Sequence, residues 1–195
     1  MSDSSDLVET QLETRCVYQG SFLNVRSDTV QLPDGRSATR EYVVHPGAVV
    51  IIPVFDDDTV LVEHQYRYPV GRIMTEFPAG KLDPGEDPLV CAQRELKEET
   101  GYSATQWAYA GYLHLAIAYS TEIIHIFFAR GLSQGAAQLD ADEFLKVERV
   151  SVDHVFQAGL KGDLTDAKTL TCLFWLQNVR SGVHTLQWID SSSFK

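Results

Sequence analysis

Three segments near the N-terminus alternate apolar and polar side chains, the pattern of half-buried strands. The turn sequence Pro33-Asp34-Gly35 separates the second segment from the third and is typical of a hairpin. We therefore predict a small antiparallel sheet over 14–45, preceded by a flexible polar arm over 1–13. The three segments are 15–19, 22–32 and 37–45.

Longer apolar runs follow, and we place the main domain at 46–195. Residues 48–55 form an apolar run typical of a buried strand, although Pro53 predicts an edge position or a bulge. Helical segments alternate with the strand-like runs, so we expect the α/β (α+β) class with a mixed sheet and flanking helices. Further strands are expected over 59–68, 73–77, 107–115, 122–130 and 144–150, and helices over 88–100, 152–158 and 167–179.

Composition narrows the range of partners. Sixteen Lys and Arg residues against 27 Asp and Glu give a net charge of −11, which argues against nucleic acid or an anionic membrane as a partner. The chain has no apolar run near the roughly 18 residues of a membrane span, and its acidic start lacks the features of a secretory signal. Cys16, Cys91 and Cys172 are far apart and odd in number, which indicates reduced thiols in a cytoplasmic protein.

The helix expected over 88–100 concentrates negative charge beside its buried stripe. Pro88 suits the first turn and Gly101 suits the position after the last one. Three glutamates fall within one arc of about 100°, adjacent to the apolar stripe and in the half of the helix where the dipole disfavours anions. The glutamates are Glu95, Glu98 and Glu99, and the apolar stripe is Leu89, Ala92 and Leu96.

A hard divalent cation would relieve this repulsion, because Mg²⁺ favours carboxylate and carbonyl oxygens and retains waters for a phosphate ligand. Arg94 lies four residues before Glu98 and can pair with it or brace the preceding loop. Gly80 and Gly85 allow that loop to bring backbone oxygens close to a metal. The alternative is a solvated helix face with ordinary ion pairs.

The whole pattern resembles the Nudix box at every defined position. The matching residues are Gly80, Glu86, Arg94, Glu95, Leu96, Glu98, Glu99 and Gly101, followed by the apolar Tyr102. The resemblance implies a Nudix hydrolase with an α/β/α sandwich, which cleaves a nucleoside diphosphate linked to another group. It also implies two or more Mg²⁺ or Mn²⁺ ions per active site, with Glu86 as a supporting residue or an outer ligand. The implied ligands are the Ala79 carbonyl, Glu95, Glu98 and Glu99.

Other segments resemble the ADP-ribose pyrophosphatase branch of that family. These are QYRYP at 65–69, EFPAG at 76–80, Arg-Glu at 40–41 and His-Pro-Gly at 45–47. In that branch the N-terminal sheet exchanges across a homodimer, so the resemblance implies a homodimer. Substrate contacts are then expected from Arg40 toward the base, from Arg67 toward the diphosphate and from Glu76 toward ribose or a metal-bound water. Ordinary surface positions are the alternative for each. Leu115 departs from the branch, which places a proline there.

The branch also carries a general base on the loop before a late strand. That loop reads QLDADE at 138–143, where Glu143 is the best match and Asp140 and Asp142 are alternatives. The residues assigned to catalysis are Glu143, Glu98 and Arg94. The expected reaction is metal-dependent hydrolysis of ADP-ribose to AMP and ribose 5-phosphate. The alternatives are another nucleoside diphosphate sugar, such as GDP-mannose or ADP-glucose, and a non-catalytic sensor of a nucleotide metabolite.

Overall fold

The computed structural model describes residues 4–139 and 144–193. The chain divides into two compact units. The first comprises Met1–Pro46 and His114–Ile123, and the second comprises Gly47–Leu113 and Ile124–Lys195. Within the described residues, no helix has both the length and the apolar character that crossing a membrane requires.

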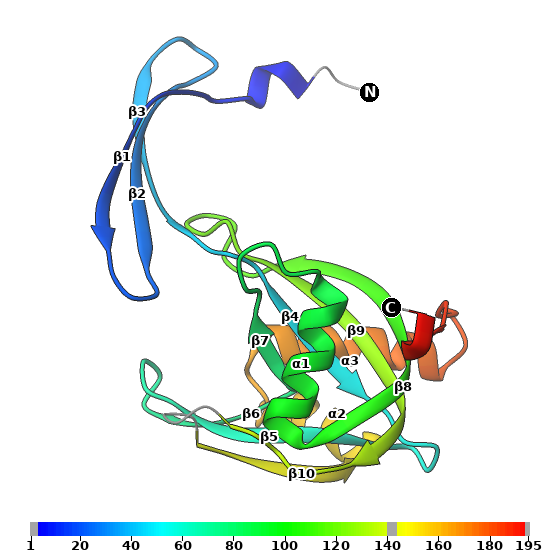
Figure 1. Cartoon of the computed structure of the whole chain (residues 1–195). Coiled ribbons are helices and arrows are strands. Elements are labelled where there is room, and N and C mark those ends of the chain that lie inside the picture. The colour runs from blue at the N-terminus through cyan, green and yellow to red at the C-terminus, as the bar shows by residue number, and fades with distance from the viewer. Residues whose placement is uncertain (1–3, 140–143, 194–195) are drawn as a thin grey trace. The chain divides into compact units, whose positions relative to one another are not determined.

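The first unit is built on a three-stranded antiparallel sheet in the order β1-β2-β3 (Figure 1). The hairpin predicted at Pro33–Gly35 forms, with the Gly35 N–H donating to the Leu32 carbonyl at 2.9 Å. The first strand starts earlier than expected, because Thr10 already pairs with Gln31. The elements are η1 (Ser4–Leu7), β1 (Thr10–Gln19), β2 (Asn24–Gln31) and β3 (Ser37–Val44).

A distant segment of the chain also belongs to this unit. The Tyr119 carbonyl accepts from the Val43 N–H at 2.8 Å, and the Thr121 N–H donates to the Val43 carbonyl at 3.0 Å. The Thr121 hydroxyl accepts from the His45 N–H at 2.9 Å. Segment 114–123 therefore joins the end of β3, a long-range pairing that no local pattern in the sequence indicates.

The described part of the second unit contains two sheets, three α-helices and one short 3₁₀ helix. A five-stranded mixed sheet has the order β11-β8-β9-β4-β7, and a three-stranded antiparallel sheet has the order β10-β5-β6. The strands are β4 (Ala48–Pro53), β5 (Thr59–Arg67), β6 (Arg72–Glu76), β7 (Ala79–Lys81), β8 (Tyr102–His114), β9 (Ile123–Gln134), β10 (Leu145–Ser151) and β11 (Ile189–Asp190). The helices are α1 (Pro88–Thr100), α2 (Val152–Lys161), α3 (Ala167–Arg180) and the short η2 (Ser191–Ser193).

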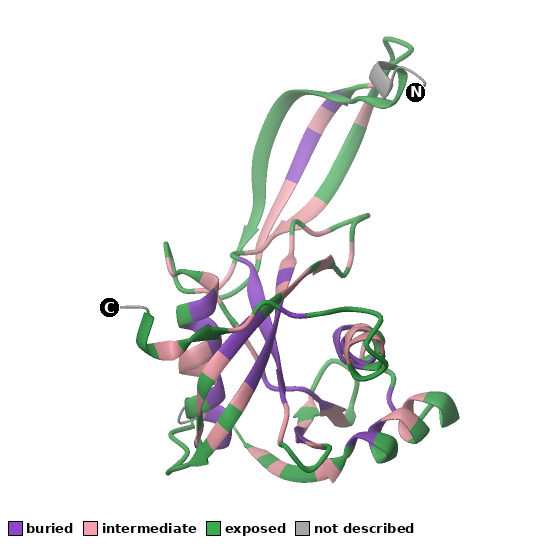
Figure 2. Cartoon of the chain, turned by 90° about the vertical axis from the view of Figure 1, so that its right-hand side faces the viewer, coloured by how far each residue is buried: buried purple, intermediate pink, exposed green. Residues whose placement is uncertain are grey.

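Alternate residues of β4 build the core on the two faces of the larger sheet. Val49 and Ile51 pack with the apolar side of α1, while Val50 and Ile52 pack with α3. The two helices lie on opposite sides of the sheet in Figure 1, and buried positions run along the central strands in Figure 2. This arrangement confirms the predicted α/β/α sandwich with a mixed sheet.

The edge position predicted from Pro53 is wrong. β4 lies between β9 and β7, and its pairing with β9 is parallel. A proline is tolerated here because β7 pairs only with Ala48, Val49 and Val50, so the ladder on that side ends before Pro53.

Candidate active site

Helix α1 begins and ends at the residues that its sequence predicts. The Asp87 carboxylate accepts from the N–H groups of Leu89 and Val90 at 2.9 and 3.3 Å, and Pro88 occupies the first turn. Gly101 ends the helix in the left-handed conformation with φ 74°. The apolar stripe formed by Leu89, Ala92 and Leu96 is buried, so the rotation of the helix is fixed and the glutamates beside that stripe share one side.

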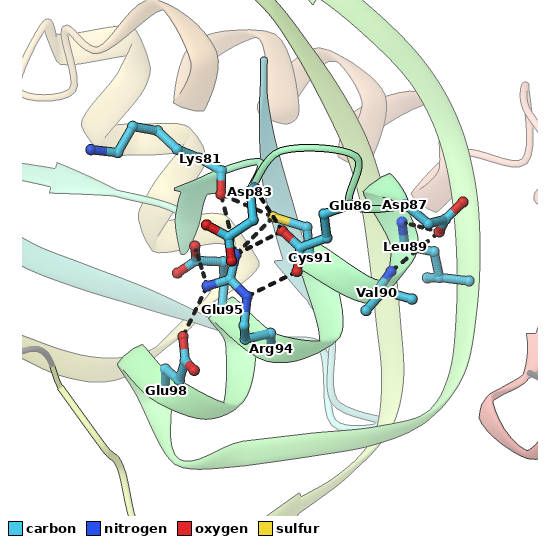
Figure 3. Close-up of polar contacts among 10 residues, drawn as sticks. All are labelled: Lys81, Asp83, Glu86, Asp87, Leu89, Val90, Cys91, Arg94, Glu95 and Glu98. Carbon is cyan, nitrogen blue, oxygen red and sulfur yellow. Dashed lines mark hydrogen bonds and ion pairs between the residues drawn. The ribbon is translucent and has the colours of Figure 1, made fainter. Parts of the chain in front are cut away.

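Arg94 ties three carboxylates of the loop and helix together (Figure 3). Its Nε and Nη2 form a two-pronged bond to Glu86, each at 2.9 Å. Its Nη1 donates to Glu95 at 2.8 Å and to Glu98 at 3.0 Å. Nη2 also donates to the Lys81 carbonyl at 3.2 Å. A single positive charge cannot neutralise three carboxylates, so the cluster remains formally negative.

The electrostatics of this cluster are visible in the pKa values of its members. Hydrogen bonds from Arg94 outweigh partial burial and, with the Asp83 N–H, lower the pKa of Glu86 to about 2. The same bonds, led by the one to Glu86, raise the pKa of Arg94. Glu86 and Arg94 are therefore both charged at neutral pH. Through this ion pair Arg94 holds the loop over residues 82–87, between β7 and α1, against the helix.

Strand β7 runs beside the glutamates of α1. Glu99 is buried, with 4% of its surface exposed, and accepts from the Ala79 N–H at 3.1 Å. The carboxylate of Glu95 lies against Gly80 so closely that a Cβ on Gly80 would be 1.9 Å from its Cδ. Gly80 is therefore required for close approach rather than for its backbone angles.

The donor chemistry of this site fits a hard divalent cation. Glu95 lies against Gly80, Glu99 accepts from the Ala79 N–H, and Glu98 shares the Nη1 group of Arg94 with Glu95. Mg²⁺ selects carboxylate oxygen ligands of this kind. The absence of a Cβ at Gly80 provides the space in which the Glu95 carboxylate lies. Among the side chains that the structure describes, no three from Asp, Glu, His or Cys already converge into a finished metal site.

A second cluster of charges is buried at the end of β6. Glu76 is only 2% exposed, and Arg67 donates to both oxygens of its carboxylate, from Nε and Nη2, each at 2.8 Å. Lys168, on α3, forms an ion pair with the same carboxylate and a second one with Asp166 at 3.0 Å. Burial raises the pKa of Glu76, but the two cations outweigh it and lower the value to about 2. The alternative of an ordinary surface position for Glu76 is therefore wrong.

Two members of this region were missed by sequence reasoning. Glu63 lies directly opposite Glu76 in the β5–β6 ladder and is fully buried. Its signal was a carboxylate inside an apolar strand. Lys168 shares the buried side of α3 with Cys172, one turn away. A lysine on that apolar side was the available signal, because a buried lysine is rare unless it is paired.

The other predicted site residues are placed as follows. Arg40 lies in β3 of the first unit, where its guanidinium forms an ion pair with Glu9. Gln138 donates its N–H to the Glu98 carbonyl at 2.9 Å, so the start of the loop expected to carry the base is attached to the C-terminal turn of α1. The predicted base Glu143 and its alternatives Asp140 and Asp142 lie outside the described residues.

Two family models match the chain. Residues 44–171 match the NUDIX domain. Residues 9–43 match the nucleoside diphosphate sugar hydrolase N-terminal domain.

Several characterised proteins are similar over most of their length. A methanol dehydrogenase activator from Bacillus methanolicus is 37% identical over 87% of this chain and 92% of its own. An ADP-ribose pyrophosphatase from Bacillus subtilis is 35% identical over 88% of this chain and 94% of its own. A crystal structure of an ADP compounds hydrolase superposes with a TM-score of 0.80 and 26% identity, covering 90% and 95% of the two chains.

Proposed function

The chain belongs to the Nudix family, and we propose that it hydrolyses the diphosphate of ADP-ribose to give AMP and ribose 5-phosphate. The observation that carries the proposal is the set of box carboxylates on α1, fixed by Arg94 and placed beside the Ala79–Gly80 backbone. The similarity to an ADP-ribose pyrophosphatase and to an ADP compounds hydrolase supports the choice of substrate class.

Glu95, Glu98, Glu99 and the Ala79 carbonyl would hold Mg²⁺ or Mn²⁺, two or more ions per site. When bound, such ions activate a water molecule and neutralise charge on the diphosphate oxygens. Arg94 orients Glu95 and Glu98 through Nη1, and Glu86 holds Arg94 in place. The Ala79 N–H, by donating to Glu99, sets the distance between β7 and the helix.

We assign proton removal from the attacking water to Glu143, with Asp140 and Asp142 as alternatives. The hydrogen bond from the Gln138 N–H to the Glu98 carbonyl supports this choice, because it attaches the segment that precedes Glu143 to α1. Glu76 would bind ribose hydroxyls or a metal-bound water.

We assign the diphosphate contact to Arg67. Its bond to Glu76 uses the Nε and Nη2 edge of the guanidinium, so the N–H groups of Nη1 lie outside that fork. A planar guanidinium fixed in this way suits bidentate recognition of a phosphate group.

The N-terminal sheet, residues 14–45, would form the contact between the two subunits of a homodimer. Arg40 would then contact the base of the substrate across the dimer interface. All of β1 is exposed, including the apolar side chains of Leu12, Val17 and Tyr18. Such an exposed apolar strand is typical of an interaction surface. Sedimentation velocity at several protein concentrations tests this assignment, since a monomer at all concentrations contradicts it. The free state of all three cysteines is consistent with a cytoplasmic location.

A product assay tests the proposed reaction. Purified protein with Mg²⁺ is incubated with ADP-ribose, ADP-glucose, GDP-mannose, NADH and a dinucleoside polyphosphate, and products are separated by ion exchange. AMP formed mainly from ADP-ribose is the expected result. Preference for another compound would support diphosphate hydrolysis but contradict ADP-ribose as the substrate. No turnover with Mg²⁺ or Mn²⁺ contradicts the enzymatic function.

A second candidate function is action on a partner enzyme, because a relative of similar identity and coverage is named as a methanol dehydrogenase activator. The test adds this chain, with and without the Glu98→Gln change, to an alcohol dehydrogenase and follows NADH formation. Activation by the wild-type chain supports this function. The same activation by the Glu98→Gln variant separates it from hydrolysis.

A further inference from the structure

The first turn of α3 contacts the candidate active site at two neighbouring positions. Lys168, 8% exposed, forms an ion pair with the Glu76 carboxylate. The next residue, Thr169, is fully buried and accepts from the Phe77 N–H through its hydroxyl at 3.2 Å. Asp166, the N-cap of α3, accepts from the Thr169 N–H at 2.9 Å and also pairs with Lys168.

The Phe77–Ala79 segment is held from three directions. Thr169 on α3 accepts from Phe77, the Pro78 carbonyl accepts from the Ile51 N–H at 2.8 Å, and Ala79 donates to Glu99 on α1. Each bond fixes one of three successive residues against a different element. The position of the Ala79 carbonyl therefore depends on α3 as well as on the box helix.

Lys168 also changes the electrostatic potential that an anion would meet beside Arg67, because both cations pair with Glu76. Both oxygens of Glu76 already accept from Arg67, so Lys168 is not needed to satisfy the hydrogen bonds of that carboxylate. Without Lys168, the negative charge of Glu76 would act on Arg67 alone and weaken its attraction for a diphosphate. With Lys168 present, its ammonium offsets part of the negative potential that Glu76 exerts at Arg67, so an anion near Arg67 is attracted more strongly.

We propose that Lys168 and Thr169 are positioning residues for the hydrolase. Lys168 sets the charge and orientation of Arg67 through Glu76, and Thr169 sets the Ala79 backbone through Phe77. The inference rests on the proposed function, since it assigns to these residues a role in binding a nucleoside diphosphate.

The test compares Lys168→Met with Lys168→Arg and with a control, Lys161→Met, which alters an exposed lysine of α2. Two quantities are measured: KM and kcat for ADP-ribose, and the Kd of a methylene-bridged ADP-ribose analogue that cannot be hydrolysed. Urea unfolding shows which variants are folded. If Lys168→Met does not fold, Lys168→Gln replaces it as the uncharged variant.

We expect Lys168→Met to raise KM and the Kd of the analogue by about tenfold or more, with kcat within about threefold of wild type, because a ground-state anion contact is weakened. Lys168→Arg recovers most of the affinity, and Lys161→Met leaves both values within about twofold. Thr169→Val raises the Mg²⁺ concentration that gives half-maximal activity, because it releases the Ala79 segment.

Two outcomes overturn the inference. One is a folded, uncharged variant at position 168 that binds the analogue as tightly as wild type. The other is an unchanged Mg²⁺ requirement in a folded Thr169→Val variant. If wild type binds the analogue but turns over no ADP-ribose, the proposed reaction fails while the effect of Lys168 on binding is still measured. If wild type does not bind the analogue, both proposals are refuted.

Discussion

Replacing Gly80 with alanine should separate activity from stability. An added Cβ would lie 1.9 Å from Cδ, 2.0 Å from Oε1 and 2.4 Å from Oε2 of Glu95. An ordinary contact needs about 3.4 Å, so the carboxylate must move by about 1.5 Å. Gly80 has no positive φ, so the change strains the side chain of Glu95 and not the backbone.

The two consequences differ in size. Moving the end of a flexible side chain to another rotamer costs about 1 kcal/mol of the free energy of unfolding. A displacement of about 1 Å in a residue that positions the reacting groups can cost about 100-fold in rate. We therefore expect Gly80→Ala to unfold within about 1 kcal/mol of wild type and to lose about 100-fold in kcat/KM.

The assay measures AMP release from ADP-ribose over a range of Mg²⁺ concentrations, together with urea unfolding. Gly162→Ala is the matched control, because Gly162 ends α2 at φ 80° with nothing within 4 Å of an added Cβ. That control should lose about 1 kcal/mol of stability through backbone strain and retain activity. Wild-type turnover and Mg²⁺ dependence in Gly80→Ala would refute the placement of Glu95 at the reacting centre.

Three further predictions concern charge. Arg94→Met should lower the free energy of unfolding by about 2 to 3 kcal/mol in urea titrations, because three carboxylates lose their shared, partly buried partner. The pKa of Glu76 falls from 4.5 to about 2 on folding, so its charge contributes stability above pH 4.5 that disappears as the pH falls toward 2. The stability difference between wild type and Glu76→Gln, up to about 3 kcal/mol at neutral pH, should therefore shrink as the pH falls from about 4.5 to about 2, and a constant difference across that range contradicts the shift. Removing metal with EDTA should abolish turnover, and restoring Mg²⁺ should raise the melting temperature of wild type more than that of Glu95→Gln; an equal rise would place the ion elsewhere.

The box helix could be predicted closely because its signals are local. Asp87, Pro88 and Gly101 set its ends, and the spacing of the apolar residues fixed which side the glutamates share. The hairpin at Pro33–Gly35 was equally local, since a turn depends on its own few residues. These features need no knowledge of what packs against them.

The features that escaped prediction depend on segments far apart in the sequence. Lys168 meets Glu76 across 92 residues of chain, and the 114–123 segment pairs with the end of β3. The edge position predicted from Pro53 was wrong because β7 is short. The pairing of β4 with β7 ends before Pro53, so no partner on that side needs the N–H that a proline lacks. In each case the deciding partner comes from another element, whose position the local pattern does not contain.

The most direct test of the account compares wild type with the Glu95→Gln, Glu99→Gln double variant in one assay of AMP and ribose 5-phosphate production from ADP-ribose with Mg²⁺. Each glutamine retains an oxygen that can accept a hydrogen bond, including the one from Ala79, so the double variant should remain folded in urea unfolding. The account predicts both products from wild type and none above background from the folded double variant. Product formation at the wild-type rate by that variant would contradict the central claim that these carboxylates build the reacting centre.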